Sequence, residues 1–390
     1  MMKKFILTVI SILALNGFAV DIPEIPGFRL LDAAHKNNLT GNVLLSPLSM
    51  QQCFGMLVGG AGEVTGGELQ EYLGLSNASV QTIQQVVNEL KSCENIQFDS
   101  CNSVIFDYRL PVEQAFINAS ARMCGAKVFK ADFSRPGDCA AMLNNIVKEQ
   151  SRGLVENLFQ DSDFAGSPLM VLLNVLYFKG NWATPFEVYD TAKAPFAVPG
   201  EDAPQEVDMM CAEMSVPYCN DGIIHGITLA YSDRRFKMMF LMPVDPNVPL
   251  SVVTERLASC GLGGFIGNST MERKTEVRLP KLQLSSDLDL RTLLAGNGME
   301  IIFSASRSDL SGIVRGIPLY VDSARQVVKL NLNEAGTEVA AVTSVMVRAC
   351  AVRPPEEMNK FHADRPFVMV LFDSVSGAVV LSAVVNRVIM

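Results

Sequence analysis

The almost unbroken apolar run over residues 169–178 constrains the fold of this chain more than any other feature. A strand with one face in water alternates apolar and polar residues, whereas a strand buried on both faces reads as a continuous apolar run. The run therefore predicts a sheet that is covered on both faces. The 390-residue chain has 49% hydrophobic and 19% charged residues, which is enough for a large core and excludes extensive disorder.

Helical patterns fill the first third of the chain, and strand patterns dominate the remainder. We expect helices over residues 49–57, 61–73, 79–90 and 138–150. We expect further strands over residues 327–333, 367–372 and 378–385, the last two joined as a hairpin by residues 373–377. The chain contains no internal repeat and no Pro/Ser-rich linker. These patterns predict a mixed α+β fold in one continuous unit.

The first residues have the pattern of a secretory signal peptide. Lys3 and Lys4 form a short basic region, residues 5–15 are apolar, and Gly17 and Ala19 are the small residues that a signal peptidase reads. We expect residues 1–19 to be removed and residues 20–390 to form a single secreted, extracellular domain. The alternative is an uncleaved anchor, although the apolar segment is short for a membrane-spanning helix.

Several classes of function are excluded by charge and by missing motifs. The formal charge is −9 and there is no basic run, so nucleic acid is not an expected partner. The three histidines are far apart and lack metal-ligand spacing, so we expect neither a metal site nor a cofactor. No GxSxG motif is present, which makes a hydrolase a weak hypothesis. No later segment is long and apolar enough to cross a membrane.

Nine cysteines in an exported chain leave two interpretations open. They can form disulfides, or they can be small buried residues with free thiols. The odd count leaves at least one thiol free or paired between chains. The close pairs are Cys93 with Cys101, Cys124 with Cys139, and Cys211 with Cys219.

The segment between Asn333 and Phe361 does not fit a compact domain. It begins with small residues, continues with β-branched ones, and closes with Pro354 and Pro355. Its length exceeds that of most loops, and its Val and Ala content is not that of a disordered linker. It has the composition of a strand without a partner. Because an exposed unpaired strand promotes aggregation, we expect the segment to have a function.

Six short motifs, taken together, resemble the serpin family, and the resemblance runs through the whole mature chain. They are NVLLSPLS from Asn42, NVLYFKGNW from Asn174, LPKL from Leu279, DLSGI from Asp309, EAGTE from Glu334, and RPF from Arg365 with VVN from Val384. Each motif alone is weak. Their number, order and spacing carry the resemblance.

The resemblance implies the serpin fold, an α+β architecture with a large central sheet A, sheets B and C, about eight to nine helices and an exposed reactive-centre loop at about 335–360. It implies a hinge for that loop, formed by Glu334, Gly336, Thr337, Glu338, Val339, Ala340, Ala341 and Val342. It also implies shutter and breach residues beneath the loop, namely Ser46, Ser49, Asn174, Trp182 and Gln326.

The sequence departs from the family pattern at several positions. Gln326 stands where the family has its shutter histidine, and it can still donate and accept hydrogen bonds. Val339 and Val342 replace residues that are mostly Ala in inhibitory members. Ala383 and Val388 replace the usual Gly and Pro. The expected helix over 79–90 has no basic face, so we expect no heparin site there.

The implied activity is suicide-substrate inhibition of a serine protease, by a monomer that is not itself an enzyme. The protease attacks the loop as bait, and the cut loop inserts into sheet A with the acyl-enzyme attached. Family spacing gives the bond between Cys350 and Ala351, with Ala349 and Arg348 as rival cleavage positions. A small residue before the bond favours an elastase-like target. Alternatives are a trypsin-like or papain-like target, or a non-inhibitory carrier, chaperone or mere substrate.

Overall fold

The structure is a computed structural model of the chain, and it describes residues 24–94, 96–153, 155–166, 168–266, 272–337 and 358–389. The predicted signal peptide, residues 1–19, lies outside the described residues. Within them, no helix is both long enough and apolar enough to cross a membrane.

The described residues form nine α-helices and fifteen strands. The helices are α2 (Ile25–Asn37), α3 (Pro47–Val58), α4 (Glu63–Leu73), α5 (Asn77–Lys91), α6 (Gln114–Cys124), α7 (Pro136–Gln150), α8 (Ser251–Cys260), α9 (Gly263–Ile266) and α10 (Leu290–Ala295). The strands are β1 (Val43–Leu45), β2 (Ile96–Asp107), β3 (Lys127–Ala131), β4 (Met170–Asn181), β5 (Ala192–Phe196), β6 (Gln205–Asn220), β7 (Ile224–Ala230), β8 (Phe236–Pro243), β9 (Glu272–Pro280), β10 (Leu282–Asp289), β11 (Ser323–Asn333), β12 (Gly336–Thr337), β13 (Asn359–His362), β14 (Phe367–Asp373) and β15 (Val379–Val385).

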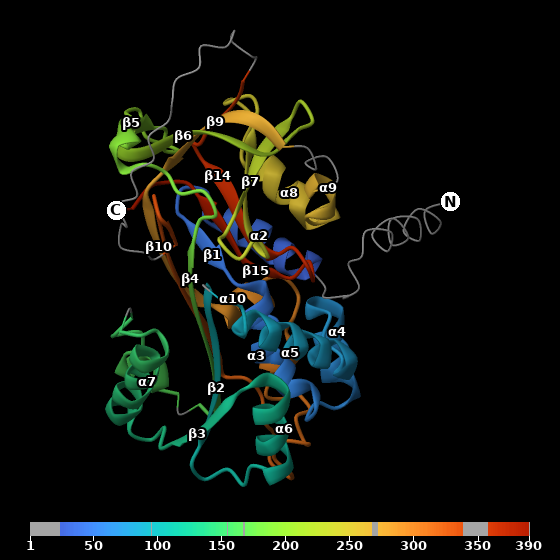
Figure 1. The fold of residues 1–390 in the computed structure, drawn as a ribbon. Coiled ribbons are helices and arrows are strands. Elements are labelled where there is room, and N and C mark those ends of the chain that lie inside the picture. The colour runs from blue at the N-terminus through green and yellow to red at the C-terminus, as the bar shows by residue number, and fades with distance from the viewer. Residues whose placement is uncertain are drawn as a thin grey trace.

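The strand β4 is central to a six-stranded sheet of order β10-β11-β12-β4-β2-β3. Alternate residues of β4 enter two different cores. Val171, Leu173 and Val175 pack with α7 on one face. Leu172 and Leu176 enter the main core on the other face, which also contains residues of α3 and α5. Figure 1 shows α7 on one side of β2 and β4 and α3, α5 and α6 on the other. Both faces are therefore covered, as the apolar run predicts.

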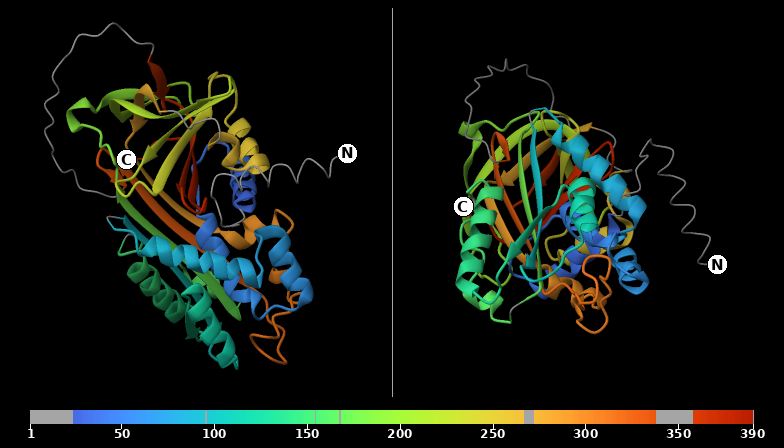
Figure 2. Two further views of the ribbon diagram at one scale, coloured as in Figure 1. Left: turned by 45° about the vertical axis from the view of Figure 1, so that its right-hand side comes forward. Right: turned by 90° about the horizontal axis from the view of Figure 1, so that it is seen from below.

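The second sheet has nine strands, and the long strand β6 connects its two parts. Met209 to Pro217 of β6 pair with β9, and Tyr218 to Asn220 pair with β7. Two of the three sheets that the resemblance implies are thus continuous through β6. The helices α2 and α8 cover one face of this sheet through a separate apolar cluster that includes Phe28 and Leu257. Figure 2 shows the two sheets from two further directions.

The expected elements are present, with shifts of a few residues at their ends. The helices expected over 49–57 and 61–73 are α3 and α4, and those over 79–90 and 138–150 are α5 and α7. The helix α3 begins two residues early because Ser46 caps it and Pro47 occupies its first turn. The predicted C-terminal hairpin is β14 and β15, paired from Phe367 with Val385 onward.

All eight cysteines in the described residues are free. The suggested pairing of Cys211 with Cys219 is wrong because both lie in β6. Eight residues along one strand separate them by roughly 26 Å, whereas a disulfide needs Cα atoms within about 7 Å. Burial raises the pKa of Cys124 to about 12, which is typical of an inert buried thiol. The structure supports the interpretation as small residues with free thiols, four of which are buried; Cys350 lies outside the described residues.

Candidate functional site

The strand β12 lies between β11 and β4 at the end of the six-stranded sheet. Gly336 and Thr337 pair antiparallel with Asn333 and Leu332 of β11, and on their other side with Asn181 and Gly180 of β4. Further along the sheet β11 and β4 pair directly, in parallel, from Ser323 with Val171 to Lys329 with Tyr177. Thr337 therefore lies at a point where two strands of the sheet have already separated.

Glycine is required at position 336 by both backbone conformation and space. The φ angle of Gly336 is +149°, a value that residues with a side chain rarely adopt. A Cβ atom here would lie 2.1 Å from the carbonyl oxygen of Gly180 and 2.8 Å from the Cα atom of Asn181. The tight turn and the close approach to β4 explain why the hinge sequence has Gly before Thr337.

Thr337 is fully buried, and its hydroxyl lies 2.7 Å from the phenol oxygen of Tyr231. Trp182, which follows β4, stacks on the Tyr231 ring with a centroid distance of 4.5 Å. The indole nitrogen of Trp182 donates to the carbonyl oxygen of Asn333 at 3.2 Å, and its backbone N–H donates to Ala335 at 2.9 Å. These contacts hold the turn between β11 and β12.

Glu334 anchors the same turn through its carboxylate. Lys281 donates to it at 3.1 Å, and the Thr191 hydroxyl donates to it at 2.9 Å. The carbonyl of Glu334 accepts from the Phe186 N–H at 2.9 Å. Burial alone would raise the pKa of this carboxyl, but the hydrogen bonds and the Lys281 charge outweigh burial and lower the pKa below its ordinary value. Glu334 is therefore an ionised, paired carboxylate.

Four of the five predicted shutter and breach residues meet under the middle of the sheet, and all four are fully buried: Ser46, Ser49, Asn174 and Gln326. Gln326 of β11 accepts from the Ser46 N–H at 2.8 Å and donates to the Asn174 side chain at 2.8 Å. The Ser49 hydroxyl donates to the same oxygen of Asn174 at 2.7 Å. Because an amide both donates and accepts, Gln326 links α3, β4 and β11 without a titratable group.

The remaining hinge positions, Glu338, Val339, Ala340, Ala341 and Val342, lie outside the described residues, as do Arg348, Ala349, Cys350 and Ala351.

Sequence reasoning missed three residues of the site. Tyr231 follows β7 and is distant in sequence from the hinge that it contacts. Asn102 of β2 extends the shutter by accepting from Asn174 at 2.7 Å. Asn333 accepts from the Ala335 N–H at 3.0 Å and shapes the turn. The period-two pattern of β2 was the one available clue, because it places a polar Asn among buried positions.

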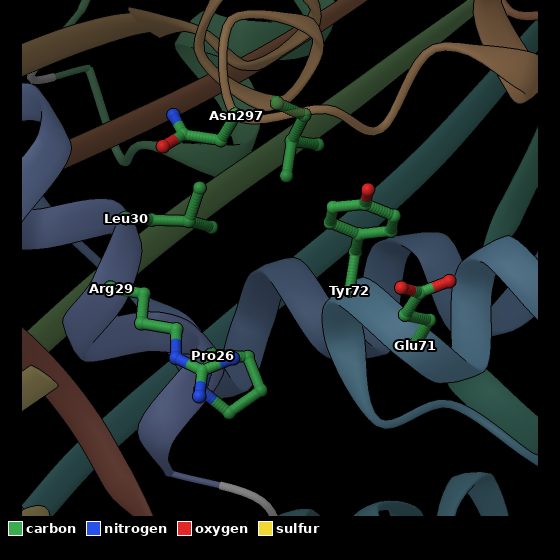
Figure 3. A pocket seen from close by; sticks show the side chains of 7 residues that line it. Pro26, Arg29, Leu30, Glu71, Tyr72 and Asn297 are labelled. Carbon is green, nitrogen blue, oxygen red and sulfur yellow. The ribbon is translucent and has the colours of Figure 1, made fainter. Parts of the chain in front are cut away.

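Two hollows in the surface lie beside α4 and are lined by none of the described hinge residues. One, with a volume of about 170 Å³, lies between Pro26, Arg29 and Leu30 of α2, Glu71 and Tyr72 of α4, and Asn297 (Figure 3). This is below the size of an ordinary small-molecule site. Within the described ranges, no three His, Cys, Asp or Glu side chains gather closely enough to hold a metal ion.

A family model described as "Serpin (serine protease inhibitor)" matches residues 26–387. The chain therefore belongs to the serpin family, and the resemblance found in its motifs is confirmed. Iripin-2 of Ixodes ricinus is 29% identical over 371 residues, which are 93% of this chain and 91% of that protein. The leukocyte elastase inhibitor of Equus caballus is 27% identical over 369 residues, which are 90% of this chain and 92% of that protein.

Solved structures confirm the α+β serpin fold. A structure described as native protease nexin-1 with heparin has a TM-score of 0.82 at 21% identity and covers 94% of this chain and 98% of its own. A structure of human thyroxine-binding globulin has a TM-score of 0.81 at 21% identity, with the same two coverages. At these identities the likeness concerns the fold alone.

Proposed function

We propose that the chain is a secreted, monomeric suicide-substrate inhibitor of an elastase-like serine protease and not an enzyme. The observation that carries the proposal is the pairing of Gly336 and Thr337 between β11 and β4. The first step of strand insertion is thus present in the intact chain. The serpin family model, described by its protease inhibition, agrees with this activity.

The register of β12 predicts where the cut loop goes. Thr337 lies opposite Leu332 and Gly180, so continuing both antiparallel ladders brings Met346 opposite Ser323 and Val171. Thr343 then enters between Gln326 and Asn174, the two sides of the shutter. Insertion replaces the parallel pairing of β11 with β4 by two antiparallel ladders, which are more stable per residue. That gain drives the movement.

The chemistry of the trap is an interrupted peptide cleavage. The serine oxygen of the protease attacks the carbonyl carbon of Cys350, the bond to the nitrogen of Ala351 breaks, and the new amino terminus takes the proton. An ester then joins the two proteins. If insertion precedes attack by water, the ester is carried away from the site of cleavage and hydrolysis stalls. Cleavage after Ala349 or Arg348 would shorten the inserted arm.

The test is incubation with pancreatic elastase, trypsin and papain, followed by a denaturing gel. We expect a detergent-stable band at the summed mass with elastase. Mass spectrometry is expected to show that the released peptide begins at Ala351. It is also expected to show that the mature chain begins at Val20. Clean cleavage of the loop by all three enzymes, without such a band, would contradict inhibition and support a carrier or a substrate.

Two variants test whether loop insertion can be lost while the protease still recognises and cleaves the loop. Thr337→Arg puts a charge at a fully buried position of the sheet, so we expect cleavage without trapping. Ser215→Arg introduces the same side chain at an exposed position of β6 and is expected to trap normally.

Heparin should not change the rate at which the protease is trapped, because Lys91 is the single Lys or Arg in α5.

A further inference from the structure

We propose that Tyr231 is a positioning residue for loop insertion: its phenol hydroxyl holds Thr337 in the first rung of the inserted ladder, so that insertion starts from a docked hinge. The kinetic consequence rests on the proposed inhibition, but the docking itself can be measured without any protease. The contact joins the two sheets, since Tyr231 follows β7 of the nine-stranded sheet and Thr337 belongs to the six-stranded one.

The space for Tyr231 exists because β4 has glycine at the rung where Thr337 pairs. A Cβ atom on Gly180 would lie 2.8 Å from a ring carbon of Tyr231. The ring thus lies directly against the backbone with which Thr337 pairs. Phe178 contacts the ring edge-on at a centroid distance of 5.1 Å, and Trp182 stacks on it. Packing on three sides fixes the position of the hydroxyl.

The hydrogen bond is buried at both ends. Tyr231 and Thr337 are each 0% exposed, so water cannot replace either partner if the bond breaks. Removing one partner would leave the other hydroxyl buried without a hydrogen bond, which is more costly than losing an exposed contact. Thr337 would then leave the sheet, where its hydroxyl can meet water. The bond therefore biases the hinge toward the docked state.

Docking matters because trapping is a competition between insertion and hydrolysis of the acyl-enzyme. A hinge that already occupies the first rung has lost its conformational freedom before cleavage, so the next residues pair without that entropic cost. An undocked hinge must first find the gap between β11 and β4. Tyr231 should thus affect the ratio of trapped to hydrolysed protease and leave the rate of loop cleavage unchanged.

The experiment is a double-mutant cycle with Tyr231→Phe and Thr337→Val, both of which keep the shape of the side chain. Each single variant leaves one buried hydroxyl orphaned, and the double variant leaves none. Exchange of the backbone amide at position 337 is expected to accelerate roughly 3- to 10-fold in each single variant and to return close to wild type in the double variant. Trp182 is the only tryptophan and stacks on Tyr231, so its fluorescence reports the same change.

With elastase, the moles of inhibitor consumed per mole of trapped enzyme should rise in Tyr231→Phe and recover in the double variant. Exchange in Tyr231→Phe equal to wild type would overturn the proposal, as would additive effects in the double variant. Absence of any trapped complex in the wild type would refute the proposed inhibition, while the exchange and fluorescence results would still decide the docking role. The melting temperature of each variant checks that the fold is intact.

Discussion

At the scale of single residues, the positions that matter are buried polar groups whose partners lie far away in sequence. Gln326 is fully buried and satisfied by Ser46 and Asn174. Glu334 is held by Lys281 and Thr191. A buried polar group without its partner costs more than the hydrogen bond itself gains. These residues therefore fix the geometry of the site even though each contributes modest net stability.

Glu24 is a half-buried carboxyl whose ionisation should be visible in the stability of the protein. It precedes α2, accepts from the Leu262 N–H at 3.1 Å, and lies where a side chain on Gly261 would be. Burial raises its pKa to about 7, with a smaller opposing effect from the Leu262 hydrogen bond. The native state therefore binds more protons than the unfolded chain between the ordinary carboxyl pKa and about pH 7, so stability falls as the pH rises through that window and stays lower above it.

Glu24→Gln keeps the acceptor for Leu262 and removes the charge. We expect the variant to match wild type near pH 4 and to become more stable than it as pH rises, by about 2–3 kcal/mol above pH 8. Urea unfolding of both proteins from pH 4 to pH 9 measures the difference. A difference that is independent of pH would show that Glu24 titrates normally.

At the scale of elements, the site is the end of the six-stranded sheet, where the two residues of β12 pair between β11 and β4. The strands β11 and β4 pair directly from Ser323 to Lys329, and β12 enters between them above that stretch. The same two strands are therefore paired directly in one part of the sheet and separated by β12 in another. The separation begins at the hinge, and the backbone conformation of Gly336 permits the turn from β11 into β12.

Gly336→Ala should expel β12 from the sheet. The new Cβ would overlap the Gly180 carbonyl, and the φ angle of +149° would be strained, so we expect a cost of about 1–3 kcal/mol for docking. Faster amide exchange at Thr337 is the expected result. Gly66→Ala in α4 is the control, because nothing lies within 4 Å of its added Cβ and helices favour Ala. Slow exchange at Thr337 in Gly336→Ala would contradict this account.

At the scale of the whole molecule, β4 carries two cores on its opposite faces, and insertion of a strand beside it must preserve both. The cluster on the α7 side and the main core are separate. Successive residues of β4 belong to one cluster and then to the other. An inserted strand would extend both clusters at once, since its residues also alternate between the faces. The proposed inhibition requires the intact fold to be less stable than the fold with the loop inserted.

Cleavage of the loop should consequently raise the melting temperature markedly. Limited digestion with elastase, followed by removal of the enzyme, gives nicked protein for a thermal scan beside the intact protein. The Thr337→Arg variant, nicked in the same way, should show a much smaller rise. An unchanged melting temperature in nicked wild type would count against insertion.

The sequence by itself determined the elements and the family. Local patterns suffice for these: an apolar run for β4, helical periodicity for α3, and period-two alternation for β11. The resemblance also indicated Gly336 and Thr337 as hinge residues. Helix ends and the merging of two sheets through β6 were not readable, since they depend on which strands become neighbours.

Only the tertiary structure decided how the site is held. Tyr231, Asn102 and Lys281 reach the hinge and the shutter from elements separated by many residues of chain, and their hydrogen bonds exist because those elements pack together. The free state of the described cysteines was decided in the same way, by positions in space that spacing along the chain does not fix. Local propensity acts over a few residues, whereas burial and partnership are properties of the assembled fold.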